Sequence, residues 1–292
     1  MPELPEVETI VRDLNKKILG RTVKDIWFDA PKLVKIPKNP RAFKKEIIGL
    51  KIEEIARRGK NIIFHLSGKK IMLIHQKMTG HLLAGCWKFE KGRWVALESG
   101  FLREKVNNYI HLMFYLDNGL MLGLSDLRKF AKVLVVDEKK FGGLEDVKNL
   151  GPEPLEKSFT FDKFKEALAR KKSGKIKQVL MEQNVIAGIG NIYADEILWE
   201  AKVYPLKDVS KLSDAELKKI YAAMKKILTL AVRLRGSSVS DYRDTAGKRG
   251  TYDLIRKVYR REGEPCPRCE TPIKRFKLGG RSGHYCSECQ TP

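Results

Sequence analysis

The sequence has few cysteines and no long apolar segment. Only five of its 292 residues are cysteine, and no run approaches the ~18 consecutive apolar residues that a membrane-spanning helix needs. The first eight residues carry three glutamates and no basic residue, whereas a secretory signal peptide begins with positive charge. These absences argue against the membrane and secreted classes and predict a cytoplasmic protein.

Acidic residues are also scarce relative to basic ones. The chain has 58 lysines and arginines against 36 aspartates and glutamates, a net charge of +22. Heat-adapted proteins often carry many charges, but in them lysine and glutamate rise together, and that balance is missing here. Because each contact between a cation and a phosphate releases condensed counterions, we expect a nucleic acid as the partner.

The first half of the chain has the pattern of a β-rich domain. Short apolar runs follow one another from Val23 to Val136, and the turn at 117–119 reads Asp-Asn-Gly between two of them, which is a strong hairpin signal. Residues 6–18 precede these runs with apolar side chains at helical spacing. We therefore predict an N-terminal domain over residues 1–138 in which helices flank a β-sandwich or barrel.

The second half has the pattern of a helical domain followed by a small module. Residues 139–154 are rich in Gly, Lys and Pro and are expected to be a linker. The domain over 155–262 contains candidate helices at 159–170, 176–183, 191–200 and 213–234, the last with a capping box at 213–216. A glycine-containing loop at 236–252 and a final module at 263–292 complete an α+β multidomain chain.

Four of the five cysteines form the most specific motif. Cys266, Cys269, Cys286 and Cys289 make two Cys-x2-Cys pairs separated by 16 residues, a spacing typical of a tetrahedral zinc site. We predict one structural zinc that holds a β-hairpin. The region from Arg233 onward has 14 basic against 7 acidic residues, so we expect it also to contact DNA. Cys86 stands alone and is interpreted as a buried, small apolar residue.

The N-terminus offers a second kind of chemistry. If Met1 is removed, Pro2 carries the terminal amine, and such amines have pKa values near 8 against about 10.4 for lysine. A secondary amine that condenses with an aldehyde-level carbon gives an iminium ion, which is an electron sink for elimination. Glu3 and Glu6 would supply carboxyls for proton transfer. The alternative is that Pro2 only begins the first helix at a favoured position.

A glycine-containing turn connects two of the candidate helices. Residues 175–184 lead through Gly188-Ile189-Gly190 to a helix that we expect to have Asn191 as its N-cap. Helix N-termini and turn amides bind phosphates, and the Asn191 amide is suited to the same contact. An ordinary helical hairpin, with Asn191 acting only as a cap, remains the alternative.

Taken together, these motifs resemble the formamidopyrimidine-DNA glycosylase family over nearly the whole chain. The resemblance rests on Pro-Glu-Leu-Pro-Glu-Val-Glu-Thr after Met1, on the zinc module and on four internal motifs. These are Arg57-Arg58-Gly59-Lys60, His75-Gln76-Lys77-Met78-Thr79-Gly80, Ser125-Asp126-Leu127-Arg128-Lys129-Phe130 and Gly188-Ile189-Gly190-Asn191-Ile192-Tyr193.

The resemblance implies a β-sandwich, a helix–two-turns–helix domain and a zinc ribbon that grip duplex DNA containing a damaged base or an abasic site. The damaged base, 8-oxoguanine or a formamidopyrimidine, would be flipped into a pocket. Pro2 would attack the sugar, and Glu3 would shuttle protons. Glu6 would support the active site, and Lys60 would assist the chemistry. The Schiff base would then decay by β- and δ-elimination, which cleaves the strand.

Further residues match DNA-contacting positions of that family. Met78, Arg128 and Phe130 would fill the void left by base flipping, a suitable role for apolar wedges and a hydrogen-bonding arginine. The remaining expected positions are the phosphate contacts and other DNA-binding positions His75, Lys177, Asn191 and Arg281, and the lesion-capping loop Val239, Ser240, Asp241 and Tyr242.

Three positions depart from the family pattern. Leu127 stands where many members have Pro, Lys129 where a second Arg is frequent, and Ala131 where Gly is usual. Ala131 would displace Phe130 if that position required a positive φ.

Other functions are also considered. Endonuclease VIII-like enzymes act on oxidised pyrimidines, but Leu4 and Met78 differ from their pattern. A catalytically silent DNA- or RNA-binding homologue would not need Pro2, Glu3 and Lys60. A ribosomal or transcription-type zinc ribbon accounts for the C-terminal module alone. No dimerisation signal is visible, so we expect a monomer that associates with the nucleoid when bound to DNA.

Overall fold

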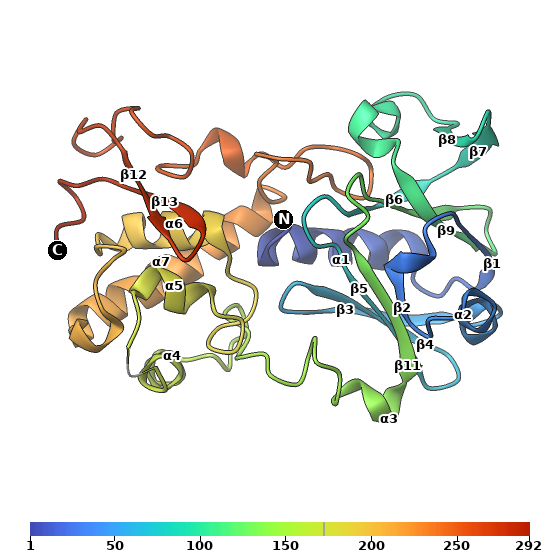
Figure 1. Cartoon of the computed structure of the whole chain (residues 1–292), viewed down its shortest axis with the longest axis horizontal. Coiled ribbons are helices and arrows are strands. Elements are labelled where there is room, and N and C mark those ends of the chain that lie inside the picture. The colour runs from blue at the N-terminus through green and yellow to red at the C-terminus, as the bar shows by residue number, and fades with distance from the viewer. Residues whose placement is uncertain (172) are drawn as a thin grey trace. The chain divides into compact units, whose positions relative to one another are not determined.

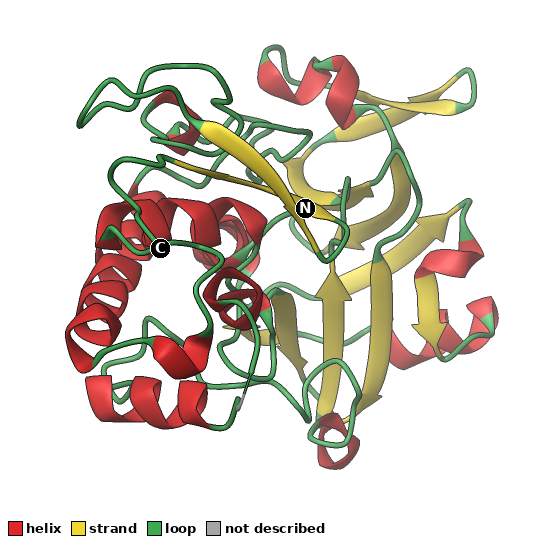
Figure 2. Cartoon of the chain, turned by 60° about the vertical axis from the view of Figure 1, so that its left-hand side comes forward, coloured by secondary structure: helices red, strands yellow, loops and turns green. Residues whose placement is uncertain are grey.

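A computed structural model of the chain describes residues 1–171 and 173–292. The contacts divide the chain into two units, Met1–Lys148 with Leu234–Asp253, and Asn149–Arg233 with Leu254–Pro292. Strands are the main regular elements of the first unit and helices those of the second (Figures 1 and 2). In this grouping the loop at 236–252 belongs with the β-sandwich, and the module at 263–292 belongs with the helices.

Two sheets form the first unit. One has four strands in the order β1-β9-β10-β6, the other has five in the order β2-β11-β5-β4-β3, and β7 and β8 form a separate hairpin. The strands are β1 (Val23–Phe28), β2 (Val34–Ile36), β3 (Ile52–Arg58), β4 (Asn61–Leu66), β5 (Lys70–His75), β6 (His81–Gly85), β7 (Trp87–Glu90), β8 (Arg93–Ala96), β9 (Ile110–Leu116), β10 (Met121–Ser125) and β11 (Lys132–Asp137). The expected hairpin turn at 117–119 joins β9 to β10, with Gly119 at φ +81°.

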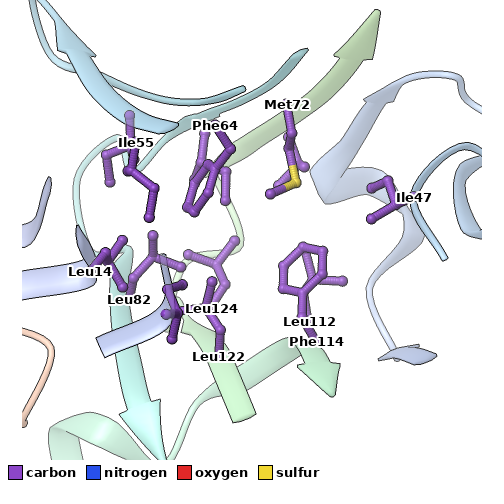
Figure 3. Close-up of a cluster of buried hydrophobic side chains, with 14 of the residues drawn as sticks. Leu14, Ile47, Ile55, Phe64, Met72, Leu82, Leu112, Phe114, Leu122 and Leu124 are labelled. Atoms are coloured by element: carbon purple, nitrogen blue, oxygen red, sulfur yellow. The ribbon is translucent and has the colours of Figure 1, made fainter. Parts of the chain in front are cut away.

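The helices of the first unit are α1 (Leu4–Ile18), α2 (Pro40–Ile47) and α3 (Glu138–Phe141). Helix α1 is amphipathic, and its apolar face is buried in the core between the sheets. Figure 3 shows Leu14 of α1 close to side chains from both sheets, among them Ile55 of β3 and Leu82 of β6. Each fully buried side chain of this kind contributes about 1.5–3 kcal/mol relative to exposure, so this core holds α1 against the sheets.

The second unit is built from helices and one β-hairpin. Its elements are α4 (Phe161–Ala169), α5 (Ile176–Met181), α6 (Asn191–Ala201), α7 (Asp214–Arg233), β12 (Lys274–Leu278) and β13 (Arg281–Tyr285). The capping box predicted before α7 is confirmed, because Glu216 accepts the Ser213 N–H at 2.9 Å and Ser213 Oγ accepts the Glu216 N–H at 3.2 Å. Among the described residues, no helix is long and apolar enough to span a membrane.

A buried histidine makes the stability of the first unit depend on pH. His81 is 1 % exposed, with Nε2 at 2.8 Å from Asn107 Oδ1 and Nδ1 at 3.2 Å from the Thr79 carbonyl. Burial lowers the pKa of His81 to about 4, although both hydrogen bonds oppose the shift. The unfolded chain therefore binds this proton more tightly, so the stability that the neutral ring contributes is complete above pH 6.5 and is lost as the pH falls toward 4.

We predict that this one group removes about 2 kcal/mol of unfolding free energy between pH 7.5 and pH 5. The measurement is urea unfolding of the wild type and of His81→Gln, which cannot take up the proton, at both pH values. The difference in stability between the two proteins should shrink by that amount at pH 5. An unchanged difference would contradict the assignment.

Candidate functional site

The N-terminal segment lies outside the first helix. Helix α1 begins at Leu4 with Glu3 as its N-cap residue, and Pro5 occupies the first turn. Pro2 is buried and precedes the cap. Pro2 therefore does not begin the helix, because Leu4 is its first residue and Pro5 its second. Pro2 is left with no role in the helix itself.

Four charged residues act on the pKa of the terminal amine, which in this chain belongs to Met1. Burial lowers the pKa of this amine, and the positive charge of Lys60 lowers it further, while Glu3, Glu6 and Asp241 act in the opposite direction. The charges of one lysine and three carboxylates therefore all act on the start of the chain.

Glu6 connects the N-terminus to the loop at 236–252. Its carboxylate accepts the Glu3 N–H at 2.7 Å through Oε2 and the Ser237 N–H at 2.7 Å through Oε1. A Cβ at Gly236, which has φ +78°, would lie 2.5 Å from Glu6 Oε1, so this position requires glycine. The expected capping loop is thereby fixed at one end to helix α1.

The four residues expected in the capping loop differ in their surroundings. Tyr242 is 3 % exposed and belongs to the sandwich core, and its hydroxyl lies 3.4 Å from the Glu6 carbonyl. Burial raises the pKa of Tyr242 well above its ordinary value. Ser240 is exposed, whereas Val239 and Asp241 are half-buried. Tyr242 therefore anchors the loop, and residues 239–241 form its accessible part.

Lys60 lies in the turn between β3 and β4 and is 7 % exposed. Arg57 stabilises this turn. It donates hydrogen bonds to the Gly59 carbonyl at 3.1 Å and to the carboxylate of Glu8 in α1 at 2.9 Å. Burial alone would raise the pKa of Glu8, but hydrogen bonds from Arg57 and Arg12 outweigh it and lower that pKa. The ion pair fixes the position of the Lys60 turn relative to α1.

His75 ends strand β5. Its Nδ1 accepts the Lys77 N–H at 2.9 Å, and burial lowers the pKa of His75 to about 3. The ring is therefore neutral at physiological pH. A contact with DNA would use Nε2–H as an uncharged donor.

Met78, Arg128 and Phe130 meet at the surface of the first unit. Met78 is 47 % exposed and Phe130 49 % exposed. Arg128 lies between them, with Nη1 at 3.1 Å from Met78 Sδ and its guanidinium carbon at 4.5 Å from the centre of the Phe130 ring. Ala131 does not have a positive φ, whereas Lys129 has φ +54°. The concern about Ala131 is thus resolved, because alanine fits its backbone conformation.

Two of the residues expected at DNA phosphates have internal partners in the second unit. Lys177 is 1 % exposed and forms an ion pair with Asp195 of α6, so its charge is not directed to the surface. Asn191 is the first residue of α6 and Gly190 is the N-cap, which corrects the cap that we expected. Asn191 Nδ2 instead donates to the Ser282 carbonyl at 2.9 Å. Arg281 is exposed.

Two acidic residues of α6 were missed by the sequence analysis. Asp195 pairs with Lys177 and accepts the His284 N–H of β13 at 2.9 Å. Glu196, which is fully buried, accepts the N–H groups of residues 257, 258 and 259 at 2.8, 2.9 and 3.0 Å. The only signal was an adjacent acidic pair inside an otherwise apolar helix. Together these carboxylates attach the C-terminal module to α6.

The four predicted zinc ligands converge. The sulfur atoms of Cys266, Cys269, Cys286 and Cys289 all lie within 4.8 Å of one another. Measured separations are 3.9 Å for Cys266–Cys289, 3.4 Å for Cys269–Cys286 and 3.5 Å for Cys269–Cys289. Four sulfurs at 2.3 Å from a tetrahedral zinc would be about 3.8 Å apart, so the residues fit one structural zinc. Cys86, expected to be buried, is only half-buried.

Models of three domain families match the chain. The formamidopyrimidine-DNA glycosylase N-terminal domain matches residues 1–133, the H2TH domain of the same enzymes matches 150–243, and the zinc finger found in FPG and IleRS matches 263–292. The β-sandwich, the helical unit and the four-cysteine module thus define a zinc-containing DNA glycosylase. The expected α+β multidomain fold and the single structural zinc are confirmed.

Full-length relatives agree with the domain matches. The chain is 37 % identical to the formamidopyrimidine-DNA glycosylase of Desulforamulus reducens, with 99 % of each chain covered. It is 39 % identical to that of Streptococcus thermophilus, again over 99 % of both. The chain belongs to the formamidopyrimidine-DNA glycosylase family, and it is a DNA-repair enzyme that acts on oxidised lesions.

Solved structures show the same fold. The Lactococcus lactis Fpg in complex with DNA containing an abasic site is 33 % identical, with a TM-score of 0.84 over 99 % of this chain and 100 % of that chain. The MutM (Fpg) protein of Thermus thermophilus is 32 % identical, with a TM-score of 0.81 over 99 % and 98 %. The family that the motifs resemble is therefore confirmed by the fold as well.

The buried ion pair gives one prediction. Asp195→Asn leaves Lys177 charged and without its partner inside the second unit, which we expect to cost about 3–5 kcal/mol of unfolding free energy. The matched control is Asp208→Asn, which breaks the more exposed pair of Asp208 with Lys175 and should cost under about 1 kcal/mol. Chemical denaturation of both variants measures the difference, and equal losses would contradict the account.

The cysteine cluster gives a second prediction, which concerns zinc content. Metal analysis should find one zinc per chain in the wild type and in Cys86→Ser. In Cys289→Ser, zinc should fall well below one per chain, because one of the four thiolates is lost. Trp199, whose Nε1 lies 3.4 Å from Cys266 Sγ, should report the loss as a change in fluorescence. Full zinc content in Cys289→Ser would refute the four-thiolate site.

Proposed function

We propose that this enzyme removes oxidised purines from double-stranded DNA and then cleaves the strand, with Pro2 as the nucleophile once Met1 has been removed. The observation that carries the proposal is the set of groups around the terminal amine. Pro2 is buried next to Glu3, whose N–H donates to Glu6, and the charges of Glu3, Glu6, Lys60 and Asp241 all act on the pKa of the amine that Met1 carries. Burial favours the neutral form of an amine, which is the nucleophilic form.

The proposed reaction begins at the sugar carbon C1′. The Pro2 nitrogen forms a bond to C1′ while the bond from C1′ to the base breaks, and the base leaves with the bonding electrons. Glu3 takes the proton that the Pro2 nitrogen still carries after the attack, which frees the nitrogen lone pair. The lone pair then forms the iminium ion as the sugar ring opens, and Glu3 passes the proton to O4′. Because Pro2 is a secondary amine, the iminium nitrogen has no proton to lose and remains an electron sink.

Two eliminations follow from the iminium ion. Loss of a C2′ proton to a carboxylate moves an electron pair into the C2′–C3′ bond and expels the 3′ phosphate. A second elimination expels the 5′ phosphate, which leaves a one-nucleotide gap with phosphates on both ends. We assign the proton transfers to Glu3. Lys60 assists as a cation close to the reacting centre. Glu6 supports Glu3 by accepting the hydrogen bond from its backbone N–H.

The other expected residues bind DNA in this proposal. Residues 239–241 cover the flipped base, while Met78, Arg128 and Phe130 enter the void that it leaves. His75 and Arg281 contact the backbone. The internal contacts of Lys177 and Asn191 support a different role from the one first expected, since both hold the β12–β13 hairpin that carries Arg281.

Structures of related proteins support the substrate class. One is MutM in complex with DNA containing carbocyclic 8-oxo-G, at 32 % identity and a TM-score of 0.84. Another is the Lactococcus lactis Fpg with DNA containing an oxidized pyrimidine, at 34 % identity. The second structure makes oxidised pyrimidines the alternative substrate, and a side-by-side comparison of excision rates decides between the two.

We predict that borohydride traps a covalent adduct between the mature enzyme and a duplex containing 8-oxoguanine opposite cytosine. The adduct forms because reduction of the iminium ion makes the bond permanent. Trapping should be lost when Met1 is retained, since the Pro2 nitrogen is then an amide, and it should fall strongly in Pro2→Gly. Gel electrophoresis of the reduced complex provides the measurement.

Pro5→Ala is the matched control, because it changes a neighbouring proline without altering the terminal amine, and it should still be trapped. The absence of both an adduct and strand cleavage on every oxidised purine tested would refute the proposal. Faster excision of an oxidised pyrimidine than of 8-oxoguanine would favour the alternative substrate.

A further inference from the structure

Asp126 lies beneath the three residues of the proposed wedge. It follows strand β10 and is completely buried, and Thr79, at the end of the loop that carries Met78, is 8 % exposed. The Thr79 hydroxyl donates to Asp126 Oδ1. This hydrogen bond joins two loops that are 47 residues apart in sequence.

The same carboxylate also fixes the backbone of the second loop. Asp126 Oδ2 accepts the N–H groups of Phe130 and Ala131, each at 2.7 Å. The Arg128 N–H lies 3.1 Å from Thr79 Oγ1 and 3.3 Å from Asp126 Oδ1. Each oxygen of the carboxylate thus holds part of the 126–131 loop, and Oδ1 also binds the Met78 loop through Thr79.

Both loops contain a residue in the left-handed region next to the wedge. Lys77 has φ +55° and Lys129 has φ +54°, conformations that cost free energy for residues other than glycine and persist only when surrounding contacts enforce them. Charge-assisted hydrogen bonds to a buried carboxylate are strong enough to do so. The exposed side chains of Met78 and Phe130 therefore project from a rigid backbone.

We propose that Thr79 and Asp126 are positioning residues that hold Met78, Arg128 and Phe130 as one preformed wedge. The inference rests on the proposed function, in which these side chains replace a flipped base. A wedge that is ordered before DNA binding loses little conformational entropy on insertion. Without the hydrogen bond between Thr79 and Asp126, the two loops would have to be ordered at the moment when the base pair opens.

Thr79→Val and Thr79→Ser test this role. Valine keeps the shape of threonine but lacks the hydroxyl, whereas serine retains it. In single-turnover experiments, Thr79→Val should excise 8-oxoguanine opposite cytosine at least about tenfold more slowly, equivalent to losing one hydrogen bond to a charged group. Thr79→Ser should match the wild type.

A second substrate separates positioning from damage to the catalytic centre. A duplex with a preformed abasic site has no base to flip, so Thr79→Val should cleave it at nearly the wild-type rate. Equal slowing on both substrates would show a merely structural role and overturn the inference, as would wild-type rates on both. Asp126→Asn, which cannot accept at both oxygens, should show the same selective loss if its melting temperature confirms that it folds.

An assay of DNA binding that does not depend on catalysis distinguishes failure of the positioning role from failure of the proposed function. A 2-aminopurine placed beside the lesion becomes fluorescent when the base step opens, whether or not the glycosidic bond is cut. If the wild type neither excises nor cleaves, the proposed function fails. The positioning role is then supported by a fluorescence rise with the wild type and Thr79→Ser but not with Thr79→Val, and is overturned by equal signals.

Discussion

The carboxylate of Glu6 holds two distant parts of the chain at one place. Its oxygens accept the N–H of Glu3, which follows Pro2, and the N–H of Ser237, which lies 231 residues after Glu6. Both hydrogen bonds are buried and charge-assisted, the class that is strongest in proteins. Because Gly236 has no side chain, the loop approaches this carboxylate closely. In the proposed mechanism the terminal amine and the 239–241 loop consequently belong to one site, which Lys60 completes from the turn between β3 and β4.

Buried carboxylates have the same function elsewhere in the molecule. Asp126 fixes two loops of the sandwich, while Asp195 and Glu196 attach the zinc-bearing module to α6. Asp126 and Glu196 each accept several backbone N–H groups, and Asp195 accepts one together with the Lys177 ammonium. Such N–H groups would lose free energy if they were buried without partners. A strongly basic surface suits the DNA partner, and the interior uses a few acids to keep the loops in place.

Motifs with local chemistry could be predicted from the sequence. The Cys-x2-Cys pairs, the Asp-Asn-Gly hairpin and the capping box at Ser213 depend on spacing within a few residues, and the structure confirms each. Long-range partners could not be predicted. Lys177 looked like a surface cation, and only the fold reveals Asp195 beside it. Asn191 looked like a cap, whereas its amide binds Ser282. The 236–252 loop is attached to the sandwich by contacts between residues far apart in sequence, such as Ser237 with Glu6 and Thr245 with Ala84, and neither pair gives a local signal.

The central claim is that the amine of Pro2, rather than a lysine, forms the covalent bond to DNA. Peptide mapping of the borohydride-reduced complex by mass spectrometry tests it most directly, because Lys60 is the nearby competing amine. The account predicts that the sugar remnant is found on the N-terminal peptide beginning Pro2-Glu3, with Lys60 unmodified. A remnant on Lys60, or on any other lysine, would contradict it.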